Sequence, residues 1–258
     1  MATANPAANV AIYRRVGYAD SATNVMTLNG TVMKTLSLLA ILLVTAGISW
    51  PEVFAFKAAT DAGQAVVPTR LAAYLGIGLI GGLITCMITI FAPRASPITG
   101  PLYAALEGLL LGAGSAFFEI RYPGIVTQAV GLTLGVLAVT LFVYGTRLIR
   151  ATEKFRIGVA AATGAIFLVY LVNFVAHLFG TGIPYIHESG MIGIGFSLFV
   201  VVIAALNLIL DFDFIEKGVE FGAPKYMEWY GGFSLMVTLI WLYLEVLRLL
   251  AKLNDRRN

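Results

Sequence analysis

Two aspartates follow a long apolar run in the last quarter of the chain. The run from Gly190 to Leu210 holds no charged residue, and Asp211 and Asp213 come directly after it. A carboxylate beside hydrocarbon is costly, so it is retained where it faces water, a partner or an ion. Acids in such positions mark ion or proton pathways. The pair is therefore the first candidate functional site.

Helical spacing separates the two aspartates. Asn207 and Asp211 are four residues apart and share one face of a helix, whereas Asp213 points nearly the opposite way. If the helix continues, only one carboxylate can face the interior, and we expect this to be Asp211, backed by Asn207. Asp213 is then expected beside Glu216 at the level of the lipid headgroups. The alternative is that both aspartates are solvated and mark only the end of the helix.

A second polar group lies on one face of the last apolar run. Glu245 and Arg248 are three residues apart and can pair. Such a pair either contributes to a site or is a structural ion pair near the membrane surface, with Arg248 extending toward the interface. The hydroxyl of Thr238 can equally bond to its own helix. The face comprises Thr238, Trp241, Glu245 and Arg248.

Two more polar residues lie inside apolar runs. Glu107, in YAALEGLLLG, is expected to be the deepest carboxylate in the chain. It could accept a proton or bind a cation, or it could be a protonated side chain that only makes a structural hydrogen bond. Asn173, in LVNFVAHLF, is expected to make a hydrogen bond between helices.

Membrane-spanning helices must position these residues. The chain has 258 residues, of which 59% are hydrophobic and only 12% charged, about half the charge of a typical soluble domain. Backbone groups in lipid need internal hydrogen bonds, which favours helices. We therefore predict an all-α integral membrane protein, with a polar N-terminal tail at 1–30 and a seven-helix transmembrane domain at 31–258. The spans are Thr35–Trp50, Leu71–Ala92, Gly100–Phe118, Ile125–Gly145, Ile157–Leu178, Met191–Leu210 and Tyr230–Leu250.

Small residues and basic residues add two details. Glycines four apart, at 78 and 82 and again at 108 and 112, are typical of helices that pack closely in lipid. The loop between the fourth and fifth spans is the richest in arginine and lysine. This places the N-terminus in the cytosol, although the basic C-terminal tail disagrees. The loop residues are Arg147, Arg150, Lys154 and Arg156.

Enzyme motifs are missing from the sequence. It contains no nucleophile elbow, no paired metal histidines and no phosphate-binding loop. One cysteine, Cys86, and two histidines leave little for covalent chemistry. We therefore expect no catalytic residue, no enzyme activity and no cofactor. Without a basic stripe, nucleic-acid binding is not expected either.

The C-terminal third carries a family resemblance. It reads LILDFDFIEKG, then GAPKYMEWYGGF, then WLYLEVLRLLAKL. This order resembles the Bax inhibitor-1 family of transmembrane proteins, especially its bacterial YccA-like branch, from about Leu71 to the C-terminus. The resemblance implies a seven-helix bundle with the last helix central, in a bacterial inner membrane.

The resemblance also implies a function. Family members are pH-sensitive cation conductors, chiefly calcium leak proteins, closed by two aspartates that share a proton. By its spacing from Ile215, Asp211 matches the sixth-helix aspartate, which makes it a pH sensor and a candidate calcium contact. Thr238, ten residues before Arg248, stands where the seventh-helix aspartate is expected. Asp211 would then bond to Thr238. Three acids could supply a replacement carboxylate: Asp213, Glu107 and Glu245.

A second function follows from the same resemblance. The YccA-like branch resembles a modulator of a membrane-bound AAA protease, engaged through a cytosolic N-terminal tail. Here the polar stretch Met1–Gly30 is long enough to serve as that handle. The chain would then be a membrane interaction protein, with the lipid bilayer and the protease as its partners and without transport activity.

Overall fold

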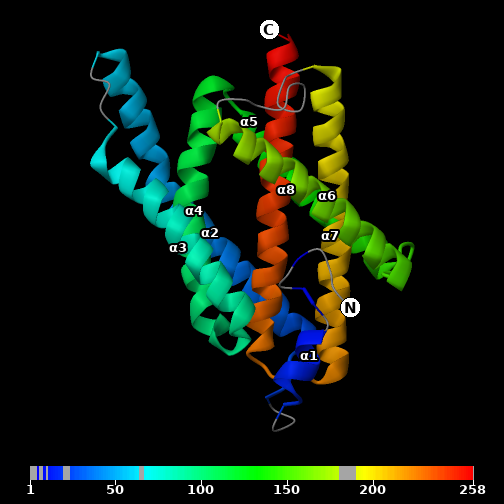
Figure 1. Cartoon of the computed structure of the whole chain (residues 1–258). Helices are drawn as coiled ribbons and strands as arrows, with labels where there is room; N and C mark the ends of the chain where they lie inside the picture. Colours follow the sequence, from blue (N-terminus) through cyan, green and yellow to red (C-terminus); the bar gives the residue numbers. More distant parts are fainter. Residues whose placement is uncertain are drawn as a thin grey trace. The chain divides into compact units, whose positions relative to one another are not determined.

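A computed structural model describes residues 5, 8–9, 11–19, 24–63, 67–179 and 190–257. Seven helices of this part are long and apolar enough to cross a membrane (Figure 1), which confirms the predicted all-α membrane fold. Of these spans, α8 is the most buried and α6 the least. The elements are α1 (Ala11–Val16), α2 (Leu28–Asp61), α3 (Thr69–Phe91), the 3-10 turn η2 (Pro93–Ala95), α4 (Ser96–Arg121), α5 (Ile125–Gly145), α6 (Glu153–Leu178), α7 (Met191–Phe221) and α8 (Met227–Arg257).

Several helices extend beyond the apolar runs that predicted them. Helix α2 continues through Pro51 to Asp61, where the sequence predicted the end of the span at Trp50. A proline inside a helix removes one backbone hydrogen bond, and membrane helices tolerate this. Helix α7 likewise continues to Phe221 instead of ending at Leu210. An apolar run in the sequence marks only the part of a helix that contacts hydrocarbon. The polar turns that extend the helix cannot be recognised from hydropathy.

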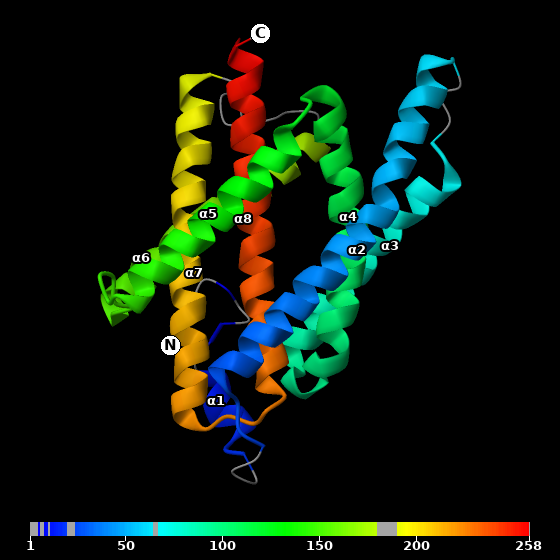
Figure 2. The ribbon, with the colours of Figure 1, turned by 180° about the vertical axis from the view of Figure 1, so that it is seen from behind.

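The chain divides into two compact units, the first of which contains the candidate site. Unit 1 comprises 1–12, 127–214 and 237–258. In it α7 and α8 run side by side, and α5 and α6 cross them obliquely in both views (Figures 1 and 2). Its buried cluster is formed by Ile166 of α6 with Val200 and Ile203 of α7, and Trp241 of α8 packs against it. Three helices therefore share one core around the site.

Unit 2, comprising 13–126 and 215–236, contains α2, α3 and α4 side by side (Figure 1). Glycines set the close approach of these helices. A Cβ at Gly78 of α3 would lie 2.9 Å from the carbonyl oxygen of Leu106 on α4. A Cβ at Gly108 or Gly112 of α4 would overlap the backbone of α2. These contacts confirm the predicted role of the glycine pairs in helix packing.

The start of α2 is completed by the start of α8. Thr27 caps α2, its hydroxyl accepting a hydrogen bond from the Gly30 amide at 2.9 Å. The carboxylate of Glu228 in turn accepts from the Thr27 amide at 3.1 Å and from the Thr27 hydroxyl at 2.8 Å. Glu228 is buried. A carboxylate suits this place because the first turn of a helix carries partial positive charge.

Candidate functional site

The centre of the site is the Asp211 carboxylate on α7, which is fully buried. Its Oδ1 accepts a hydrogen bond from the side-chain amide of Asn5 at 3.2 Å. The same amide nitrogen donates to the Thr238 hydroxyl on α8 at 3.2 Å. Both hydrogens of the amide are thus used, and all three side chains are buried. We refer to Asn5, Asp211 and Thr238 as the amide cluster.

The amide cluster changes the predicted partner of Asp211. The sequence indicated a bond from Thr238 to the carboxylate, and the Asn5 amide instead bridges the two. Asn5 was not predicted, because it belongs to no motif in MATANPAANV and lies more than two hundred residues from its partners. The hydrogen-bond donor to the carboxylate is therefore a neutral amide.

Asn207 shares the buried face of Asp211 but bonds elsewhere. Its amide donates to the Thr163 hydroxyl of α6 at 2.9 Å and to the Ile203 carbonyl of its own helix at 2.9 Å. Asn207 is buried on this face as predicted, and its hydrogen bonds go to Thr163 and Ile203. Its role is to tie α7 to α6 one turn away from Asp211.

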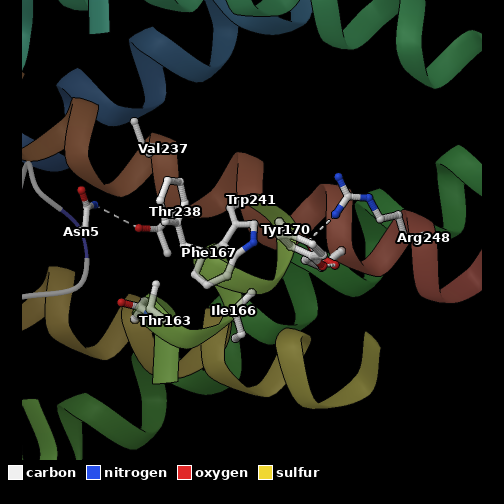
Figure 3. A pocket seen from close by; sticks show the side chains of 11 residues that line it. Asn5, Thr163, Ile166, Phe167, Tyr170, Val237, Thr238, Trp241 and Arg248 are labelled. Atoms are coloured by element: carbon white, nitrogen blue, oxygen red, sulfur yellow. Dashed lines mark hydrogen bonds and ion pairs between the residues drawn. The ribbon is translucent and has the colours of Figure 1, made fainter. Parts of the chain in front are cut away.

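A cavity of about 400 Å³ lies beside the amide cluster. Figure 3 shows Asn5 and Thr238 at one end, Arg248 at the other, and Trp241 between Thr238 and Tyr170. Its walls are mostly apolar, with polar groups gathered at both ends, as is usual for binding or passage sites between helices. Asp211 does not line the cavity itself and bonds to the lining residue Asn5. The lining residues are Asn5, Thr163, Ile166, Phe167, Tyr170, Asn207, Val237, Thr238, Trp241, Glu245 and Arg248.

The far end of the cavity holds the predicted ion pair. Arg248 Nη1 donates to Glu245 Oε1 at 2.7 Å, and the Tyr170 hydroxyl donates to the same carboxylate at 3.0 Å. The guanidinium also lies over the Tyr170 ring, 5.3 Å from its centroid. The pairing of Glu245 with Arg248 is confirmed, and so is the shared face with Thr238 and Trp241, since all four line the cavity.

Asp213 is paired and largely buried. Its side chain is only 14% exposed, and Asp213 Oδ2 lies 2.6 Å from Nη2 of Arg156, near the start of α6. The Arg156 side chain is 11% exposed. Helix α7 continues past both aspartates, and the face that carries Asp213 is covered as well as the face that carries Asp211. The alternative that both aspartates only mark a solvated helix end is therefore wrong.

Neither Glu107 nor Asn173 belongs to the amide cluster. Glu107 belongs to α4 in unit 2, where it is half-buried with its Oε2 against Gly82 of α3. Asn173 is half-buried on α6. Within the described part of the chain, no three His, Cys, Asp or Glu side chains gather into a group that could hold a metal ion. The calcium contact at Asp211 therefore stays a prediction.

A strained residue supports the helix next to Asp211. After α5 ends, the amide of Arg147 donates to the Tyr144 carbonyl at 3.0 Å, and Leu148 donates to the Val143 carbonyl at 3.1 Å. This is the helix ending that favours glycine in the left-handed region, yet Arg147 has a φ of 59°. The Tyr144 ring packs on Phe212, with centroids 5.8 Å apart. The turn therefore fixes a ring adjacent to Asp211.

Replacing Arg147 with glycine is expected to stabilise the protein by roughly 0.5 kcal/mol. Relief of the left-handed strain exceeds the cost of a more flexible unfolded chain and of the lost contact between Arg147 and the Tyr144 ring. Unfolding by detergent titration measures the change. Gly222, at a φ of 70°, provides the reverse control. Gly222→Ala is expected to destabilise the protein. Loss of stability in Arg147→Gly would show that the side-chain contact outweighs the strain.

Comparison with known proteins identifies the family. A family model described as Bax inhibitor 1 like matches residues 4–255, nearly the whole chain. No curated protein and no solved structure matches the chain. The match extends well before Leu71, where the resemblance in sequence was expected to begin, and it includes Asn5. On this match, and with seven helices able to span a membrane, the chain belongs to the Bax inhibitor 1 like family of membrane proteins.

Proposed function

We propose that this chain is a membrane leak path for cations, with calcium as the first candidate, and that protonation of Asp211 opens it. The observation that supports the proposal is a fully buried carboxylate held by the Asn5 amide at one end of a cavity of about 400 Å³. Acids buried in membrane helices mark ion and proton pathways. Membership of the family and the seven spans agree with this function.

The amide cluster gives the direction of the pH response. An ionised carboxylate accepts a stronger hydrogen bond from the Asn5 amide than a protonated one does. Proton uptake by Asp211 removes the charge, weakens this bond and loosens the contact between Asn5 and α7. The path is therefore closed when Asp211 is ionised, and the leak increases as the pH falls.

Asp211 is the group expected to respond to pH, because the charged side chains around it are paired with one another. From α6, Arg156 faces α7 but is engaged with Asp213. From α8, Glu245 and Arg248 neutralise each other at the far end of the cavity. The described residues of the N-terminal segment before α1 are uncharged. Each neighbouring acid thus has a cation of its own.

Calcium flux into proteoliposomes, measured from acidic to alkaline pH, tests the proposal. Wild type is expected to leak more as the pH falls. Asp211→Asn is expected to leak at every pH, because the amide cannot carry the charge that closes the path. The open population should rise on the order of tenfold at alkaline pH, the change expected for losing a hydrogen bond to a charged group.

Asp61→Asn provides the matched control. Asp61 is an exposed aspartate paired with Lys57 on α2, and its loss should leave the flux profile unchanged. Absence of flux at every pH from both wild type and Asp211→Asn would refute the leak function. Equal flux with the same pH profile in both would retain the leak and remove Asp211 as its sensor.

A further inference from the structure

We infer that the cavity of unit 1 binds one acyl chain of an anionic phospholipid, and that Arg248 holds the phosphate of its head group. The cavity is the one lined by Thr238, Trp241 and Arg248. The inference goes beyond the proposed leak function, because binding of the lipid is measured without any ion flux.

The length of the cavity matches an acyl chain in one leaflet. Thr238 and Arg248 line its two ends (Figure 3) and are ten residues apart on α8. This separation corresponds to about 15 Å along a helix axis. The hydrocarbon core of a bilayer is about 30 Å thick, so each leaflet contributes about 15 Å. A chain whose head group lies at Arg248 would therefore end near Thr238.

The walls of the cavity suit an acyl chain that enters from the bilayer. Ile166 is buried, whereas its neighbour Phe167 is 64% exposed, and both line the cavity. Exposed apolar side chains on a helix long enough to span a membrane mark a surface that contacts lipid. At the deep end Asn207 donates to the Thr163 hydroxyl at 2.9 Å, so these two polar groups satisfy each other. The cavity thus extends from a lipid-facing side chain to the core of unit 1.

Arg248 is placed to hold an acidic head group. Its side chain is 43% exposed, whereas the side chain of its partner Glu245 is fully buried. Arg248 Nη1 donates to Glu245 at 2.7 Å, and a guanidinium has five N–H donors, so others remain for a second acceptor. Arginine often binds phosphate through two parallel hydrogen bonds. The buried carboxylate therefore orients the guanidinium, and its exposed side is available to a phosphate.

The charges of this part of α8 favour an anion. Between positions 245 and 256 the helix has two acidic and three basic residues, a net charge of +1. One of the basic residues is Lys252, one turn beyond Arg248. Its ammonium donates to the Gly193 carbonyl at 3.0 Å and to the Ser197 hydroxyl at 2.8 Å, and neither acceptor is charged. Basic pockets between membrane helices bind anionic head groups.

Quenching of Trp241 fluorescence by brominated acyl chains tests the inference. The chain has three tryptophans, so Trp50→Phe with Trp229→Phe leaves only Trp241, which lines the cavity. Bromine quenches tryptophan on contact, so the signal reports a chain inside the cavity. In vesicles of unbrominated phosphatidylcholine, brominated phosphatidylglycerol is expected to quench at a roughly fivefold lower mole fraction than brominated phosphatidylcholine does. Equal quenching by the two lipids would overturn the inference.

A double variant tests the role of Arg248. Glu245→Gln with Arg248→Gln removes the guanidinium, leaves no single buried charge and keeps the net charge of α8. It should abolish the preference for phosphatidylglycerol. Arg256→Gln is the control, because Arg256 is exposed and does not line the cavity, and it should keep the preference. An equal loss in the double variant and in Arg256→Gln would show general attraction to α8 and would overturn the assignment of Arg248.

Val237→Phe tests whether the chain lies inside the cavity. Val237 lines the cavity, so the larger ring fills space that the chain needs, and quenching by both lipids should fall. Val172→Phe is the same substitution at an exposed position of α6 that does not line the cavity, and it should leave quenching unchanged. Equal quenching in Val237→Phe and Val172→Phe would place the chain outside the cavity and overturn the inference.

Discussion

Arg156→Met is expected to destabilise the protein by about 3–5 kcal/mol. The guanidinium nitrogen lies 2.6 Å from the Asp213 carboxylate, and both side chains are nearly buried, at 11% and 14% exposed. Removing the cation leaves the carboxylate in a place where water cannot replace the lost partner. Detergent-titration unfolding, followed by circular dichroism, measures the loss. Because Asp213 is two residues from Asp211, a local shift of α7 should also raise the leak.

A surface pair in the same chain provides the control. Lys57 and Asp61 on α2 lie 2.5 Å apart, with side chains 48% and 64% exposed. Exposed pairs of this kind contribute only about 0.2–1 kcal/mol, so Lys57→Met should change stability little. The double variant Arg156→Met with Asp213→Leu should recover most of the loss, because neither charge is then left buried. Equal effects of Arg156→Met and Lys57→Met would contradict the assigned burial of the pair.

Gly112→Ala is expected to cost about 3 kcal/mol, at the upper end for overpacked sites. A Cβ on Gly112 would overlap the carbonyl oxygen of Ala46 and the hydroxyl of Ser49 on α2. The first of these is backbone, so α2 and α4 must move apart, and the contacts along their shared surface are lost. The higher helix propensity of alanine offsets only about 1 kcal/mol of this. The free energy of unfolding in detergent again measures the result.

Gly114 offers a control two residues along the same helix. A Cβ at Gly114 meets nothing within 4 Å. Gly114→Ala should therefore be neutral or stabilising by up to about 1 kcal/mol, the difference in helix propensity. A comparable loss in both variants would show that the cost comes from the helix itself and not from the approach of α2.

Features that depend on local composition could be predicted from the sequence. Uninterrupted apolar runs specify helices in lipid because no other backbone arrangement satisfies its own hydrogen bonds there. The choice of Asp211 over Asp213 as the fully buried carboxylate followed from the helical repeat, together with its deeper position and Asn207 on the same face. Glu245 and Arg248 lie within one turn of each other, so their pairing was visible in the sequence as well.

Features that depend on long-range packing could not be predicted. Arg156 is 57 residues from Asp213, and Asn5 is 206 residues from Asp211. No spacing rule relates such positions. The polar turns that extend α2 to Asp61 were also missed, because they carry no apolar signal. The sequence therefore located the candidate site through the Asp211 carboxylate. The hydrogen-bond partners that determine the chemistry of Asp211 could be identified only in the folded structure.

The cap on α2 has a consequence for biogenesis. Domains fold as the chain emerges, starting from the N-terminus, and α2 leaves the ribosome before α8. Its first turn receives the Glu228 carboxylate from a residue synthesised 201 positions later. Until α8 emerges, the Thr27 amide and hydroxyl lack this acceptor. The first membrane helix is thus completed only by the last, so a nascent chain arrested before α8 remains an unfinished substrate for insertion and quality control.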